Sequence, residues 1–307
     1  MRSSRLAISD GFYADRRAPG YNLPIFEEAR MKLVIRGVAR VLMLLVALAL
    51  ASSPADAQLA PQNKDGLTFA QVSLNVKDIA AHKKLWVDVC EGVLVEKNGI
   101  TAVKFPGMLL ILNQAPSAGP SQGDVLDHFG FKVKDTALWS AKLKAAGLQV
   151  MPPFTGAEGF PNAYATTTDG VRIELQEDKT QKEDVIGYHV HFFTSDYVSL
   201  MDWYVKTFNL EPFKRGSIAT TANAPGMNFS FGNLPRGAEK ARPTKGSAID
   251  HLGFEIKNLE AYCKALEAKG VKFDVPYHVD ARTGIKSAFL TDPLGTSIEL
   301  TEGLDKF

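Results

Sequence analysis

Cysteine is scarce in this sequence, because only Cys90 and Cys263 occur among its 307 residues. A chain of this length can bury a proper core without disulfide staples. The two residues fall in corresponding helical segments of different repeats, described below, where two buried thiols are expected. A disulfide between them is the alternative if the chain lies in an oxidising compartment.

An excess of charge of either sign is also lacking. The whole chain has 35 basic and 34 acidic residues, and residues 1–57 contain 8 and 5 of these, which leaves 27 basic and 29 acidic residues in 58–307. This balance provides no electrostatic attraction to nucleic acid or to an anionic membrane surface, so neither is expected as a partner.

Long hydrophobic runs are missing except for residues 41–51, which are too few to span the ~30 Å of hydrocarbon in a bilayer. A basic stretch, residues 31–40, precedes this run, and the small residues Ala55 and Ala57 follow it. This order is typical of a secretory signal peptide cleaved before Gln58. A periplasmic or secreted protein, free of the membrane after cleavage, is therefore expected; an uncleaved membrane anchor is the alternative.

A strand pattern recurs four times along the chain. Each copy has apolar or near-apolar residues one, three and five places after a marked position, and Asp or Asn seven places after it. Such alternation puts the marked side chain on the face opposite the core. The spacings are 57, 61 and 62 residues, and the marked residues are Gln71, His128, His189 and His251.

Each repeat predicts a strand, a helix and about three further strands, and we call this βαβββ unit a module. The expected fold is α+β, with four modules paired into two curled mixed sheets and with helices outside. The helices of modules 1 and 3 resemble each other, as do those of modules 2 and 4, which indicates duplication of a two-module ancestor. We therefore expect neighbours to pair, which gives an N-terminal domain at 58–184 and a C-terminal domain at 185–307, after the extension and signal peptide at 1–57.

These features resemble those of the vicinal oxygen chelate superfamily, which includes glyoxalase I, extradiol dioxygenases and bleomycin-resistance proteins. The resemblance covers about residues 67–304 and rests on the fourfold pattern, on the His of the first strands and on the closing segment Thr-Asp-Pro-Leu-Gly-Thr-Ser-Ile-Glu-Leu at 291–300. The superfamily contains enzymes of several classes and metal-free binding proteins, so the resemblance implies the fold more firmly than the activity.

In this superfamily the metal ligands come from the first and last strands of paired modules. For modules 3 and 4 the resemblance implies His189, His251 and Glu299 as ligands, with Ser230 at the remaining position. Two imidazoles and one carboxylate with open positions suit a divalent ion such as Fe(II), Mn(II), Zn(II) or Ni(II).

For modules 1 and 2 the corresponding residues are Gln71, His128 and Glu174, with Ile111 at the fourth position. Glutamine is a ligand type in this superfamily, although it is neutral and weaker. The alternative for Glu174 is a remnant of duplication, paired with Arg172 or with water.

A metal in such a site chelates two neighbouring substrate oxygens and stabilises the charge that develops. The ligand order resembles that of extradiol dioxygenases, but Phe289 stands where that family uses Tyr, and no His lies between His191 and His251. His191 and His278 are the candidate acid or base residues. Their alternatives are a supporting role beside the ligands and simple exposure.

The sequence thus predicts an exported, divalent-metal-dependent enzyme that acts on a small vicinal-oxygen substrate as lyase, isomerase or ring-cleaving oxygenase. The alternative is a non-catalytic small-molecule or metal-binding protein of the bleomycin-resistance type. Arg215 and Arg282 are candidates for binding an anionic substrate group, with exposed surface arginine as the alternative. Two internal module pairs complete their sites within one chain, so either a monomer or a homodimer is compatible.

Overall fold

The computed structural model describes residues 59–307 except Glu239. The predicted signal peptide and its cleavage point therefore lie outside the described residues. Within the described part, no helix has the length and apolar character needed to cross a membrane.

Modules 1 and 2 follow the predicted order of strand, helix and further strands. Module 1 contains β1 (Leu67–Val76), α2 (Ile79–Lys83), a π-helical turn (Lys84–Val89), β2 (Val93–Lys97), β3 (Ile100–Phe105) and β4 (Met108–Gln114). Module 2 contains β5 (Leu126–Val133), α3 (Thr136–Ala145), β6 (Gln149–Val150), β7 (Phe154–Thr155), β8 (Pro161–Thr166) and β9 (Arg172–Glu177).

Modules 3 and 4 repeat this order. Module 3 contains β10 (Val185–Phe193), α4 (Tyr197–Phe208), β11 (Glu211–Arg215), β12 (Ile218–Ala224) and β13 (Met227–Gly232). Module 4 contains β14 (Ile249–Ile256), α5 (Leu259–Ala268), β15 (Val275–Val279), β16 (Lys286–Thr291), β17 (Ser297–Glu302) and a final 3₁₀ turn η2 (Leu304–Lys306).

The residue seven places after each marked position stands at the start of a helix, as predicted, but only two of the four cap it with their side chain. The carboxylates of Asp78 and Asp135 accept the backbone N–H of Ala81 and Leu138. Asn258 has a positive φ of 59° and makes no capping bond. The carboxylate of Glu302 caps this helix instead, because it accepts the Leu259 N–H at 2.9 Å.

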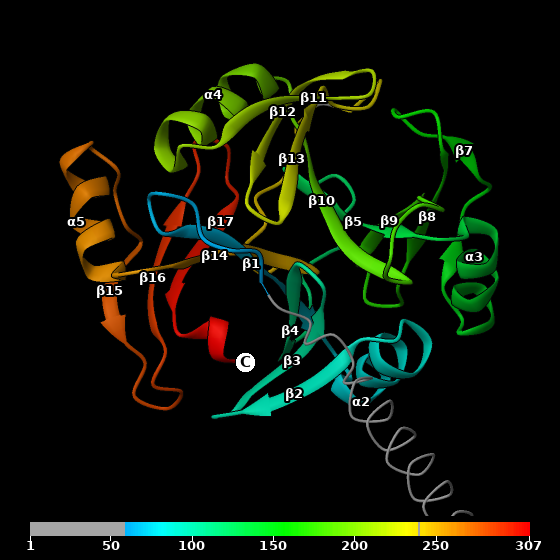
Figure 1. Cartoon of the computed structure of the whole chain (residues 1–307), viewed down its shortest axis with the longest axis horizontal. Coiled ribbons are helices and arrows are strands. Elements are labelled where there is room, and N and C mark those ends of the chain that lie inside the picture. The colour runs from blue at the N-terminus through cyan, green and yellow to red at the C-terminus, as the bar shows by residue number, and fades with distance from the viewer. Residues whose placement is uncertain (1–58, 239) are drawn as a thin grey trace, which may run out of the picture. The chain divides into compact units, whose positions relative to one another are not determined.

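The strands form two mixed sheets, and Figure 1 shows the helices on their outside. The first sheet has the order β15-β16-β17-β14-β1-β4-β3-β2, and the second has the order β11-β12-β13-β10-β5-β9-β8-β6. Each is built around an antiparallel pair of first strands, β1 with β14 and β5 with β10. The predicted fold class is confirmed.

The predicted pairing of neighbouring modules is wrong. Module 1 shares its sheet with module 4, and module 2 shares its sheet with module 3. The predicted boundary at 184/185 therefore falls inside the second sheet, and the described residues belong to one compact unit. All four first strands carry the same alternation, so the pattern of any one of them leaves its partner undetermined.

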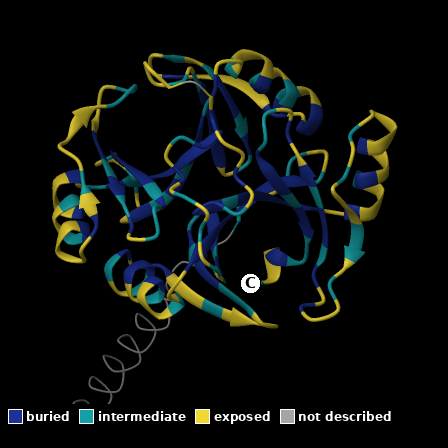
Figure 2. Ribbon diagram, turned by 180° about the vertical axis from the view of Figure 1, so that it is seen from behind, coloured by how far each residue is buried: buried dark blue, intermediate teal, exposed yellow. Residues whose placement is uncertain are grey.

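The core consists of buried apolar residues from the strands and the helices of all four modules. Figure 2 shows that the central strands of both sheets are largely buried. Phe69 of β1 and Phe254 of β14 pack against Phe229 of β13, with ring centroids 5.9 and 5.7 Å from it. Both cysteines are buried free thiols, as predicted. The faces of the sheets opposite the helices carry the polar residues that are described next.

Candidate metal centres

The described residues bring the predicted ligands together in two groups that differ from the predicted ones. His189 lies in the second sheet, whereas His251 and Glu299 lie in the first, so the set predicted for modules 3 and 4 is divided. The set predicted for modules 1 and 2 is divided in the same way. The reason is that module 1 pairs with module 4 and module 2 pairs with module 3. Each first strand therefore meets the candidate ligands of a different module from the one predicted.

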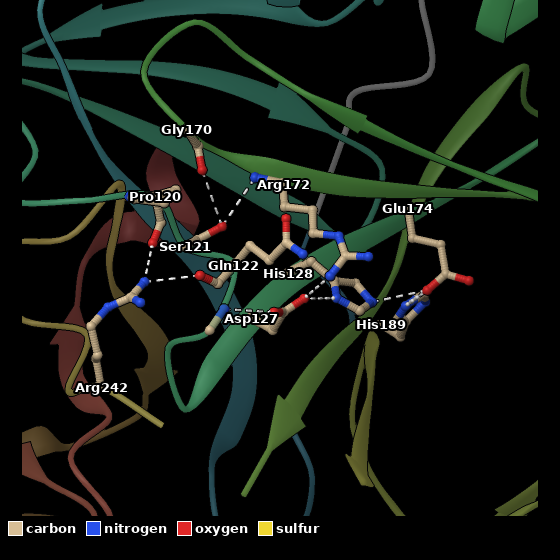
Figure 3. Close-up of polar contacts among 11 residues, drawn as sticks. Pro120, Ser121, Gln122, Asp127, His128, Gly170, Arg172, Glu174, His189 and Arg242 are labelled. Atoms are coloured by element: carbon tan, nitrogen blue, oxygen red, sulfur yellow. Dashed lines mark hydrogen bonds and ion pairs between the residues drawn. The ribbon is translucent and has the colours of Figure 1, made fainter. Parts of the chain in front are cut away.

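Site A lies in the second sheet and comprises His128, Glu174, His189 and His191. All four side chains are buried, and one ligand atom from each lies within 4.8 Å of the others. One oxygen of Glu174 on β9 is 2.9 Å from Nε2 of His128 on β5 and 3.1 Å from Nε2 of His189 on β10 (Figure 3). Three ligand-type atoms from three strands therefore converge on one point.

Asp127 orients the imidazole of His128. Its Oδ1 lies 2.7 Å from His128 Nδ1 and accepts a bond from Arg172 at 2.8 Å, and its Oδ2 accepts the Gly123 N–H. A carboxylate on Nδ1 fixes that nitrogen as the donor and directs Nε2 toward Glu174, which is the usual arrangement of a metal-binding histidine. The predicted alternative for Glu174, pairing with Arg172, is not what the structure shows, because Arg172 pairs with Asp127.

The pKa values of site A reflect this contact between acid and base. Burial lowers the pKa of His128, but its bonds to Asp127 and Glu174 outweigh that effect and raise it. Burial opposes ionisation of Glu174, yet its bonds to the two imidazoles hold its pKa well below the usual range. Burial and the nearby charge of Arg215 lower the pKa of His189 to about 4. An imidazole between two carboxylates needs either a second proton or a cation at Nε2, so this donor set fits a metal ion.

His191, predicted as an acid or base, belongs to the same cluster. It lies two residues beyond His189 on the same face of β10 and directly opposite His128 on β5. Its Nδ1, like that of His189, is buried without a hydrogen-bond partner in the described part of the chain. Burial and the charge of His128 hold the pKa of His191 well below its usual value, so the ring is neutral and free to act as a ligand.

Site B occupies the equivalent place in the first sheet and comprises Gln71, His251 and Glu299. Oε2 of Glu299 on β17 lies 3.3 Å from His251 Nε2 on β14 and accepts a bond from the amide of Gln71 on β1. Asp250 binds His251 Nδ1 at 2.6 Å and is held in turn by the Gly246 N–H. The pair Asp250 and His251 thus repeats the arrangement of Asp127 and His128.

The electrostatics of site B follow the same pattern as those of site A. Burial lowers the pKa of His251, but its bonds to Asp250 and Glu299 exceed this effect and raise it to about 9. A divalent cation at Nε2 would replace that proton, with Glu299 and the amide oxygen of a turned Gln71 as further ligands. The residues of site B therefore also fit a metal, with the side-chain amide of Gln71 in place of the His189 imidazole.

Site B opens into a cavity of about 230 Å³, whereas the ligands of site A are buried. The predicted acid or base His278 lies on the cavity wall, half-buried, with its Nε2 3.5 Å from the Ser287 hydroxyl. Exposed Arg282 lies at the same cavity. Arg215, by contrast, is buried in the second sheet, where it donates to Gln176 at 3.3 Å.

Several residues beside the ligands were missed in the sequence, above all Gly130 and Gly253. Each stands two places after a marked His and directly opposite the ligand of the partner strand. A Cβ on Gly130 would lie 2.1 Å from the His189 ring, and one on Gly253 would lie 2.6 Å from the Gln71 side chain. The recurring spacing His-x-Gly was the signal that could have identified them.

Asp127, Asp250 and Tyr164 were missed as well. The two Asp residues each directly precede a marked His, and this repeated Asp-His pair is visible in the sequence. Tyr164 on β8 holds the site A position that corresponds to Phe289 in site B, because each pairs with the glutamate of its site. Its ring lies edge-on to His128 at 5.2 Å and stacks on Phe154.

Comparisons with known proteins agree with this architecture. Residues 188–300 match the family model of the Glyoxalase/Bleomycin resistance protein/Dioxygenase superfamily. Glyoxalase I from Zea mays has a similar structure, with a TM-score of 0.60 and 15% identity over 78% of this chain and 94% of its own. A putative dioxygenase from Bacillus subtilis gives a TM-score of 0.58 and 12% identity over 80% and 86%. Among curated proteins, none matches the chain in sequence. At these identities the structural neighbours share the fold alone.

Proposed function

Residues 188–300 belong to the Glyoxalase/Bleomycin resistance protein/Dioxygenase superfamily, and from this premise we propose that the protein is a divalent-metal-dependent enzyme with its active centre at site B. Its substrate would be a small molecule with two neighbouring oxygen atoms, such as a diol, a catechol-like compound or a hydroxy-carbonyl compound. The reaction would be that of a lyase, an isomerase or a ring-cleaving oxygenase.

One observation carries this proposal: the cavity of about 230 Å³ lies directly over Gln71, His251 and Glu299. Three protein ligands leave positions for substrate, which is the pattern of catalytic metal sites. When bound, the ion would supply Lewis-acid stabilisation of negative charge on the substrate oxygens.

Residues in and beside the cavity would orient the ligand His251, move protons and bind the substrate. Asp250 keeps His251 in the tautomer that presents Nε2, because it accepts from Nδ1. His278 lines the cavity next to the Ser287 hydroxyl, where its imidazole would take or return a substrate proton. Arg282 at the cavity matches an anionic substrate group.

A non-catalytic binding protein is the second candidate, and Phe289 favours it. Phe289 places an apolar ring edge-on to His251, 5.5 Å away, where the extradiol dioxygenases have a tyrosine hydroxyl. Site B would then hold the metal and a ligand without proton transfer. This observation also weighs against ring cleavage among the proposed reactions.

Metal analysis with matched carboxylate variants tests the proposal. Protein purified without chelators is compared with Glu299→Gln, which removes a ligand, and with Glu260→Gln, which changes an exposed carboxylate on α5. We expect Glu299→Gln alone to lose one equivalent of metal and roughly 100-fold or more of its turnover of diols or hydroxy-carbonyl compounds.

The outcomes separate the candidates. Unchanged metal content in Glu299→Gln would overturn site B as a metal centre. If Glu299→Gln lacks a metal equivalent that wild type binds, but wild type converts none of these compounds, the protein is a binding protein and not an enzyme.

We also propose that the protein is exported to the periplasm or beyond the cell. The basic stretch, apolar run and small residues within 31–57 support this. The intact mass of protein recovered from its native cells is expected to correspond to residues 58–307, and a mass that includes the apolar run would contradict cleavage.

A further inference from the structure

The two sites have the same plan but differ at one position. His191 in site A lies opposite His128, and Ser73 in site B lies opposite His251. Both positions are two residues beyond the first-strand ligand on the same face of the strand. The internal repeat thus permits a direct comparison of what each side chain does.

In site B this position is open. The Ser73 hydroxyl accepts a bond from Asn113 at 2.8 Å, and both residues line the cavity. A short side chain here leaves room for a substrate beside the metal position.

In site A the imidazole of His191 fills the equivalent space. Its ring centroid lies 5.0 Å from that of His128 and 6.1 Å from that of His189. One of its nitrogens is among the ligand atoms that lie within 4.8 Å of one another. The neighbouring Ser230 on β13 leaves space for the ring, and its hydroxyl donates to Asn228.

Because the cluster is buried, Nδ1 of His191 has no solvent to bond with. Nδ1 of His191 has no hydrogen-bond partner within the described residues, although the side chain is buried. A buried polar atom of this kind is unfavourable unless something binds it. A metal ion bound among these side chains would provide a partner for a nitrogen of the His191 ring, because one ligand atom from each of the four residues lies within 4.8 Å of the others.

We infer that site A is a closed metal centre with four protein ligands, in which His191 supplies the fourth and blocks access of substrate. Three imidazoles and one carboxylate in a four-coordinate arrangement suit Zn²⁺ in a structural role. The ligands come from modules 2 and 3, so the ion joins the two halves of the chain. This role is independent of the proposed function, since it holds whether or not site B turns over a substrate.

Cobalt substitution tests the coordination number at site A. Glu299→Gln serves as the parent protein, because it removes a site B ligand and leaves site A unchanged. We expect one equivalent of Co²⁺ with the intense visible bands of four-coordinate cobalt. His191→Ser, which copies the residue of site B, is expected to change the position and intensity of these bands as water replaces the imidazole, and to lower the affinity about tenfold or more. Ser73→Ala in the same parent is the matched control and leaves the spectrum unchanged.

Three results would overturn the inference: absence of bound cobalt in the parent, a five- or six-coordinate spectrum in the parent, or an unchanged spectrum in His191→Ser. If His191→Ser does not fold, the paramagnetically shifted NMR signals of the cobalt-loaded parent decide the question. Signals from three imidazole rings are expected, and signals from two would exclude His191. This test does not measure turnover. Failure of the inference about site A can therefore be distinguished from failure of the proposed function at site B.

Discussion

Two glycines determine how closely the ligands of each site approach one another. Gly130 and Gly253 lie on the central strands opposite His189 and Gln71, and the ligand side chain covers the space where a Cβ would be. A glycine inside a strand normally weakens it, since it has no side chain to pack and loses more chain entropy on folding. Here the absence of a side chain admits the ligand from the partner module.

Gly253→Ala is therefore expected to displace Gln71 from Glu299. The added methyl group would overlap Gln71 Cγ at 2.6 Å, which predicts a destabilisation of about 1–3 kcal/mol and weaker metal binding at site B. Thermal unfolding and metal titration measure these two effects. Gly119→Ala is the control, because its Cβ would meet no atom within 4 Å. Equal stability and metal affinity in both variants would contradict the proposed close approach.

At the scale of elements, the end of β17 is held by a buried carboxylate on β14. Glu255 accepts the N–H groups of Gly303 and Leu304 and the hydroxyl of Thr301. These bonds position η2, whose Leu304 lines the cavity of site B. Burial nevertheless raises the pKa of Glu255 to about 6.

This pKa predicts that Glu255 makes stability depend on pH. The folded protein holds the proton more tightly than the unfolded chain, so the contribution of Glu255 is full below pH 4.5 and is lost as the pH rises through about 6. The loss amounts to about 2 kcal/mol. Glu255→Gln, which resembles the protonated form, is expected to lack this step. Denaturant unfolding of both proteins from pH 4 to 7 measures the difference; parallel curves would contradict the prediction.

At the scale of the whole molecule, the two halves of the chain are joined through the centres of both sheets. The strand pairs β1 with β14 and β5 with β10 each combine one strand from 58–184 with one from 185–307. The central strands are largely buried on both faces, so separation of the halves would expose apolar strand edges.

A fragment of residues 185–307 alone is therefore expected to associate or aggregate, because β10 and β14 have lost their antiparallel partners β5 and β1. Mixing it with residues 58–184 is expected to restore a soluble one-to-one complex. Light scattering after size exclusion measures both, with residues 58–307 as the reference. A folded monomer of 185–307 would show that neighbouring modules pair, as the sequence first indicated.

The sequence by itself determined the modules, because alternation along a strand and the repeat spacing are local properties, and its resemblance to a known superfamily indicated the candidate ligands. His128, Glu174, His189, His251, Glu299 and Gln71 all lie on the polar faces of their sheets, in one site or the other. Only the tertiary structure decided which of them meet, because pairing between first strands of equal pattern depends on packing across the whole molecule. It also decided that His191 lies buried among the candidate ligands of one site while the other site, beside Ser73, opens into a cavity, since room for a ligand is set by side chains from several modules at once.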